Sequence, residues 1–156
     1  MRGQWIPLTV TLAIQAMVAM AVLTLPVMAP AVAQALGASA AYAGVYVAIV
    51  YAGGMAASLA GGTAVARWGA IRVSQAGLVL CAAGLALCAV PSLAAMALGA
   101  FLIGLGYGPI TPASSHLLAR TTPAHRMSLV FSIKQTGVPL GGVLAGAIVP
   151  GVAVVA

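Results

Sequence analysis

Long segments without any formal charge constrain this chain more than any other feature. No residue from Gly3 to Ala66 is charged, and none is charged from Val73 to Ala119. An α-helix needs about 20 consecutive apolar residues to cross a lipid bilayer, so each segment has room for more than one crossing. Only 4% of the residues are charged, whereas a soluble domain carries about 25%. The chain is therefore predicted to be a membrane protein.

Turn signals divide the apolar sequence into about five transmembrane helices. Residues 34–39 are predicted to be a polar loop, 61–72 a short basic turn, 91–92 a tight turn and 119–126 a second basic loop. Glycines and prolines inside the fourth helix predict that it is bent. The predicted fold is an all-α, polytopic membrane helical bundle. It forms one transmembrane region with helices at about residues 5–25, 41–60, 71–90, 94–118 and 127–150.

The first apolar segment has a second interpretation, as a secretory signal peptide. Residues 31–33, Ala-Val-Ala, resemble a cleavage site. However, the apolar core of a signal peptide has about 7–15 residues, and the segment from Trp5 to Leu25 is longer than that. It also precedes further membrane sequence. We therefore expect a first transmembrane helix, with Trp5 at the membrane interface.

The arginines predict the orientation of the bundle. With the helices above, every arginine falls on the same side of the membrane, and the loops on the opposite side have none: Arg2, Arg67, Arg72, Arg120 and Arg126. Cytoplasmic loops carry an excess of basic residues. We expect a multi-pass protein of the bacterial inner (plasma) membrane, with its amino terminus and both basic loops in the cytoplasm.

Composition also excludes several classes of function. The chain has no Asp and no Glu, so it cannot provide a carboxylate acid–base pair or a hard-cation site. Its two histidines and two cysteines are too dispersed for a metal centre. Its basic residues are scattered, and nucleic-acid binding needs a clustered patch. We expect no catalytic residue, enzyme activity, metal, cofactor or nucleic-acid partner.

Small residues recur at helical spacing and predict close contacts between helices. Gly54, Ser58 and Gly62 follow one another every four residues in the second helix and the turn after it. The fourth and fifth helices contain further glycines, which would let a neighbouring backbone approach. The residues expected to pack helices together are Gly54, Ser58, Gly104, Gly108, Gly137, Pro139, Gly141 and Gly142.

Two of these segments resemble the major facilitator superfamily of transporters. Residues 62–72, GTAVARWGAIR, resemble the family's loop between its second and third helices, with matches at Gly62, Arg67 and Gly69. Ala66 and Ala70 stand where the family usually has Asp and Arg, and Arg72 closes the motif. Residues 132–142, SIKQTGVPLGG, resemble the glycine- and proline-rich fifth helix of the family.

The resemblance covers essentially the whole chain, as helices one to five of a usual twelve. It implies secondary transport of a small solute by alternating access, between two helical halves that rock around a site near the membrane midplane. The chain would be an incomplete amino-terminal half, a fragment or a truncated product. Its partner would be the carboxyl-terminal half or a second copy. The alternative function is that of a membrane structural or interaction subunit that transports nothing.

Lys134 is the first candidate for binding a solute, because a charge within a membrane helix is costly and by default functional. Together with Gln135, it would bind a polar or anionic solute. Gln15 in the first helix and Tyr107 in the fourth could line the same cavity. The alternatives are that Lys134 extends to the membrane surface and that Gln15 only joins two helices.

Overall fold

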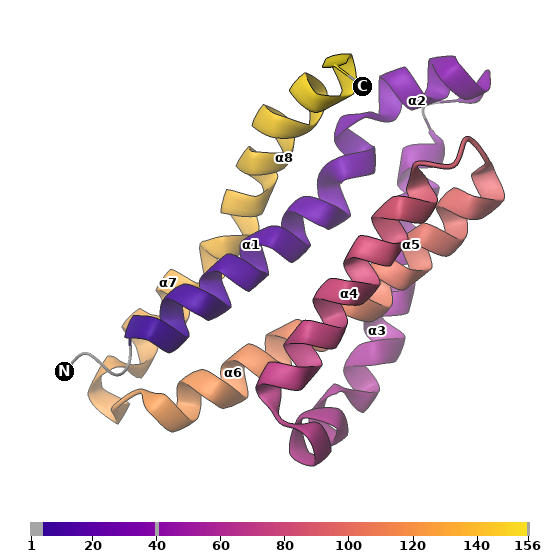
Figure 1. Cartoon of the computed structure of the whole chain (residues 1–156). Helices are drawn as coiled ribbons and strands as arrows, with labels where there is room; N and C mark the ends of the chain where they lie inside the picture. The colour runs from indigo at the N-terminus through magenta and orange to yellow at the C-terminus, as the bar shows by residue number, and fades with distance from the viewer. Residues whose placement is uncertain (1–4, 40, 156) are drawn as a thin grey trace.

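The computed structural model describes residues 5–39 and 41–155, and all regular structure in those ranges is helical. This confirms the predicted all-α class. The α-helices are α1 Trp5–Val27, α2 Ala29–Leu36, α3 Tyr42–Trp68, α4 Ala70–Cys88, α5 Leu93–Tyr107, α6 Ile110–Thr121, α7 Met127–Gln135 and α8 Gly137–Val155, and a short 3-10 helix, Ala124–Arg126, precedes α7. The arrangement is shown in Figure 1.

Four of the described helical segments are long and apolar enough to cross a membrane: Trp5–Val27, Tyr42–Trp68, Ala70–Cys88 and Leu93–Thr121. The last of these combines α5 and α6, which are interrupted at Gly108 and Pro109, as the predicted bend requires. Helices α7 and α8 follow one another with a break at Thr136, and α8 runs beside α1 (Figure 1).

The predicted basic turn was too long. Residues 61–68 are helical and belong to α3, and α4 begins at Ala70, so the second helix does not end at residue 60. Only Gly69 separates the two helices. Its φ of 84° and ψ of 153° belong to a conformation that is essentially restricted to glycine. One glycine therefore reverses the chain, and the residues before it, which do not break helices, continue α3.

The predicted polar loop at residues 34–39 was also partly wrong, because α2 extends to Leu36. Pro30 lies in the first turn of α2, where proline's fixed φ suits a helix and its missing N–H costs nothing. Gly37 ends the helix with a φ of 60°. The N–H of Ala38 then donates to the carbonyl of Ala33 at 2.9 Å, as in a glycine-terminated helix.

Three helix contacts dominate the packing. Helix α1 lies along α8, and α5 lies between α3 and α4. Fully buried aliphatic side chains from these helices form the centre of the largest core cluster, including Val18, Val50 and Ile103. Because no core residue in this cluster is charged, dispersion and close backbone approach hold the bundle together.

Glycines allow the closest approaches. A Cβ on Gly104 would overlap the carbonyl oxygen of Val50, and a Cβ on Gly137 would lie 2.9 Å from the Gln15 Cβ. Gly54, Gly108, Gly141 and Gly142 also contact neighbouring helices. Gly62 does not continue the predicted stripe, because its Cβ position is open, whereas a Cβ on Gly61 would lie 3.0 Å from the Cγ of Pro112. A shift of one residue turns a helical side chain by about 100°, which explains this difference.

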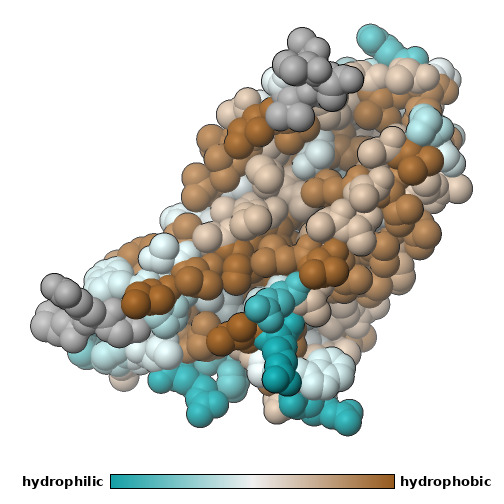
Figure 2. All heavy atoms as spheres, in the orientation of Figure 1, coloured by the Kyte–Doolittle hydropathy of each residue, from teal (hydrophilic) through white to brown (hydrophobic). Residues whose placement is uncertain are grey.

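The described arginines gather at one end of the molecule. Figure 1 places the α3–α4 turn and the α6–α7 junction at the lower end, and most of the strongly hydrophilic atoms visible in Figure 2 lie there. Arg72 and Arg120 line one groove at this end. Arg2 lies outside the described residues. The described end of α8 lies at the opposite pole (Figure 1).

Candidate functional site

Lys134 is buried inside the bundle, with only 1% of its surface exposed. It lies on α7, one helical turn after the buried Val130. The eight residues that separate it from Arg126 correspond to about 12 Å along a helix axis. Lys134 therefore does not extend to the surface of the described bundle, as the alternative prediction would require.

The neighbours of α7 and α8 place Lys134 at a definite level of the bundle. Towards the basic end, Val130 packs in one cluster with Leu8 of α1 and Leu118 of α6. Towards the opposite end, Gly137 lies against Gln15 of α1. Since α1 and α8 run parallel (Figure 1), Lys134 lies between the level of Leu8 and the level of Gln15.

Polar side chains occupy this same level. Gln15 is 1% exposed, and its Oε1 has no hydrogen-bond partner among the described residues. The Thr11 hydroxyl donates to the carbonyl of Pro7 at 2.8 Å, and the Ser114 hydroxyl donates to the carbonyl of Ile110 at 2.8 Å. Both hydroxyl oxygens keep lone pairs as acceptors.

Thr11 and Ser114 also line a cavity of about 170 Å³ between α1, α4 and α6. The other walls of this cavity include Val10, Ile14 and Leu78, so its surroundings are mainly apolar. It lies on the side of α1 that faces α4 and α6. The polar groups of Thr11 and Ser114 therefore have space beside them that a water molecule or a small solute could enter.

This level of the bundle holds a positive charge that no acidic side chain of the protein neutralises. The Lys134 ammonium is buried, and the chain has no Asp or Glu to neutralise it. A buried unpaired ion costs several kcal/mol, unless an opposite charge or hydrogen-bond acceptors compensate it. The arrangement can therefore bind an anion, which would supply the charge that the chain's own side chains lack.

The comparison with protein families decides what kind of molecule this is. The family model described as Major Facilitator Superfamily matches residues 11–156. The chain belongs to the Major Facilitator Superfamily. It is thus a membrane transporter of the major facilitator type, from a family of carriers rather than enzymes. No curated protein and no solved structure matched the chain.

Two of the predicted solute-binding residues of this facilitator do not share the buried surroundings of Lys134. Gln135 is exposed, because the next position along α7 turns away from the buried face. Tyr107 packs edge-on against Tyr51 of α3, with ring centroids 6.2 Å apart and an interplanar angle of 88°. Of the three other candidates, the structure thus brings only Gln15 into the bundle interior at the level of Lys134.

Sequence reasoning missed Thr11 and Ser114 as parts of this level in the facilitator bundle. Thr11 precedes Gln15 by four residues, so the spacing alone places both on one helix face. Ser114 lies four residues before the buried Leu118 on α6. That spacing would have become informative only with the knowledge that α6 packs beside α1 and α7.

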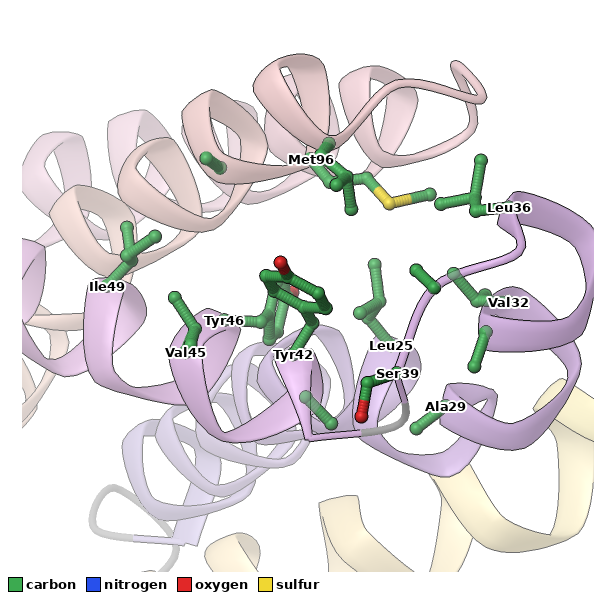
Figure 3. Close-up of a pocket in the computed structure, with 15 residues that line it drawn as sticks. Leu25, Ala29, Val32, Leu36, Ser39, Tyr42, Val45, Tyr46, Ile49 and Met96 are labelled. Atoms are coloured by element: carbon green, nitrogen blue, oxygen red, sulfur yellow. The ribbon is translucent and has the colours of Figure 1, made fainter.

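A separate apolar cavity of about 210 Å³ (Figure 3) is lined by residues of α1, α2, α3 and α5, near the end of this facilitator opposite the α3–α4 turn (Figure 1). Tyr42 and Tyr46 of α3 point into it beside Leu25, Leu36 and Met96. These rings therefore face a cavity.

In the ranges that the structure describes, no group of three or more His, Cys, Asp or Glu could hold a metal ion.

Proposed function

We propose that this facilitator transports a small anionic solute and that Lys134 is the residue that binds its charge. The single observation that carries the proposal is the burial of Lys134, 1% exposed, in a chain that has no acidic side chain. A solute anion would pair with the ammonium where the surroundings exclude water and strengthen the interaction. Desolvation of Lys134 would then favour anions over neutral solutes.

Gln15 would complete the binding site from α1. Its amide has an acceptor oxygen and two N–H donors. The Oε1, which has no partner among the described residues, would accept a hydrogen bond from the Lys134 ammonium. The amide N–H groups would donate to the solute. Gln15 would therefore orient the lysine and recognise the anion at the same time.

Alternating access requires a second helical bundle facing this one. We propose that the chain contributes five helices of an amino-terminal half, and that the second bundle is a carboxyl-terminal half or a second copy. A second copy would bring no Asp or Glu side chain, so in that assembly the solute would remain the source of negative charge. The protein would lie in the inner (plasma) membrane, with its amino terminus in the cytoplasm.

A ligand-stabilisation experiment on the full chain tests this proposal. The melting temperature of the purified protein in detergent would be measured with succinate, lactate, inorganic phosphate and, as the neutral control, glycerol. We expect at least one anion to raise the melting temperature of the wild type, and not that of Lys134→Met. Lys134→Arg, which keeps the charge, should retain part of the response.

Uptake by cells that express the chain gives a second readout. Radiolabelled forms of the same anions would be compared between wild type and Lys134→Met at equal membrane abundance. The proposal would be contradicted if a neutral solute stabilised the protein and was taken up, and if both effects persisted in Lys134→Met. A chain that binds no solute and supports no uptake would favour the alternative of a non-transporting membrane subunit.

A further inference from the structure

An open groove at the basic end of the molecule lies outside the site described above. It has a volume of about 670 Å³ and is formed by the α3–α4 turn and the last two turns of α6. Arg72 enters it from α4, and His116 and Arg120 enter it from α6. These three side chains are exposed. The groove therefore combines basic groups from two helices that are distant in sequence.

The charge of this groove is not balanced by the chain. Arg72 and Arg120 face the same space, and the sequence has no Asp or Glu to place between them. Two guanidinium groups around one groove raise the local positive potential and favour a bound anion. Guanidinium groups match the geometry of phosphate oxygens, with which they form paired hydrogen bonds.

The rest of the lining is apolar or interfacial. Trp68 and Ile71 flank the groove at the turn and are 61% and 64% exposed, and Leu117 lies in its wall. Tryptophan is enriched where a protein meets the headgroup layer. A soluble phosphate would leave the exposed apolar side chains in water. A phospholipid would cover them with its glycerol and acyl-chain region while its phosphate meets the arginines.

We propose that this groove binds the phosphate headgroup of an anionic phospholipid in the leaflet at the basic end of the protein. Arg72 and Arg120 hold the phosphate, His116 and Gln75 lie close enough to the groove to hydrogen-bond the headgroup, and Trp68 packs against the lipid below it. The site is independent of Lys134, because it lies at the surface of the bundle and uses other residues. Solute binding at Lys134 and lipid binding here can therefore fail separately.

Fluorescence quenching of Trp68 provides a direct test on the full chain. The sequence has two tryptophans, so a Trp5→Phe background leaves Trp68 as the single reporter inside the groove. The protein would be titrated in mixed micelles with phosphatidylglycerol brominated on its acyl chains, and separately with brominated phosphatidylcholine. We expect phosphatidylglycerol to quench Trp68 at a several-fold lower lipid fraction.

Charge-matched variants separate the groove from general attraction to the basic end. Arg72→Gln with Arg120→Gln removes both phosphate contacts, and Arg67→Gln with Arg126→Gln removes the same charge outside the groove lining. Each basic side chain near an anionic surface contributes about a factor of five through general attraction, so either pair should weaken phosphatidylglycerol binding by up to about 30-fold on that account alone. The first pair also loses the paired hydrogen bonds to the phosphate, so its loss of affinity should exceed that of the second pair several-fold. Unchanged circular dichroism would show that both pairs remain folded.

Three results would overturn the proposal. The first is equal quenching by the two lipids, which would show only apolar contact. The second is an equal loss of affinity in both double variants, which would show nonspecific attraction. The third is displacement of the brominated lipid by glycerol 3-phosphate at low concentration, because a soluble phosphate would then be sufficient. Retention of the lipid in a large excess of glycerol 3-phosphate supports the headgroup site.

Discussion

The hydroxyl of Ser58 on α3 donates a hydrogen bond of 3.1 Å to the carbonyl oxygen of Gly108, where α5 ends. In a continuous helix this carbonyl would accept the N–H of residue 112, but Pro112 has none. Pro109 likewise cannot donate to the carbonyl of Leu105. The prolines thus open the helix between α5 and α6, and a side chain from the neighbouring helix satisfies one of the released carbonyls.

Ser58→Ala should therefore destabilise the bundle. The substitution leaves the Gly108 carbonyl without a donor in an apolar environment, and we expect the free energy of unfolding to fall by about 1 kcal/mol. Titration with sodium dodecyl sulfate, followed by circular dichroism, measures this change. Thr63→Ala is the matched control, because the Thr63 hydroxyl bonds only within its own helix, to the carbonyl of Ala60 at 2.8 Å.

Alanine substitutions at Gly104 and at Gly62 should change the free energy of unfolding in opposite directions. At Gly104 the new Cβ would overlap the carbonyl oxygen of Val50, and overpacking of this kind costs about 1–3 kcal/mol. At Gly62 the position is open, and alanine should stabilise the helix by about 0.5–1 kcal/mol. The same unfolding titration compares both. Equal destabilisation would mean that α3 and α5 are not in the contact described here.

Gly69→Ala should be destabilising for a different reason, its backbone conformation. Nothing lies within 4 Å of a Cβ at this position, but its φ is 84°. Forcing a side chain into this region costs about 1–3 kcal/mol. The expected loss of unfolding free energy would be compared with the gain in Gly62→Ala, seven residues earlier. If Gly69→Ala were neutral, the one-residue turn between α3 and α4 would be wrong.

Lys134→Met should raise stability while it removes anion binding. The methionine side chain fills a similar space without a buried charge, so we expect the unfolding free energy to rise by about 1–3 kcal/mol in the absence of anions. Lys134→Arg should bring no such gain, since the charge remains. Unfolding curves with and without added phosphate separate the intrinsic gain from the ligand effect. A destabilised Lys134→Met would indicate that the ammonium already has a strong partner.

Labelling of single cysteines tests the orientation in the membrane. Cys81→Ala with Cys88→Ala provides a background without cysteine, to which Ala35→Cys or Ala124→Cys is added at exposed positions near opposite ends of the bundle. An impermeant maleimide should label Ala35→Cys in intact cells, and Ala124→Cys only after permeabilisation, because the basic end faces the cytoplasm. The reverse pattern would invert the proposed topology.

The sequence predicted the helices better than their ends. The length of the apolar segments was sufficient to place the helix predicted at residues 71–90, which is α4. The two prolines near residue 110 were sufficient to predict the bend between α5 and α6. The extent of α3 was wrong because Gly61 and Gly62 suggested a turn. Glycine weakens a helix in water, yet inside a bundle the loss of side-chain packing is offset by a close approach, here of Gly61 to Pro112.

The candidate site was only partly accessible to sequence reasoning. Lys134 was identified because a charge in an apolar helix is unusual whatever its neighbours are. Its relation to Gln15 depends on α8 packing parallel to α1, with Gly137 against Gln15. The groove that joins Arg72 to Arg120 was not predicted, since these residues are far apart in the chain and their proximity requires α4 to pack against α6.

The sequence alone was sufficient to predict a membrane-inserted bundle of helices, with its arginines on one side of the membrane. That follows because a charge or an unpaired backbone group in lipid costs free energy. This cost depends on the sequence of each segment and not on its neighbours. Which polar residues share a level, and which glycines touch a neighbour, depends instead on how the helices pack together. A rotation of one residue, about 100°, moves a side chain between lipid and interior, and packing between helices sets that rotation.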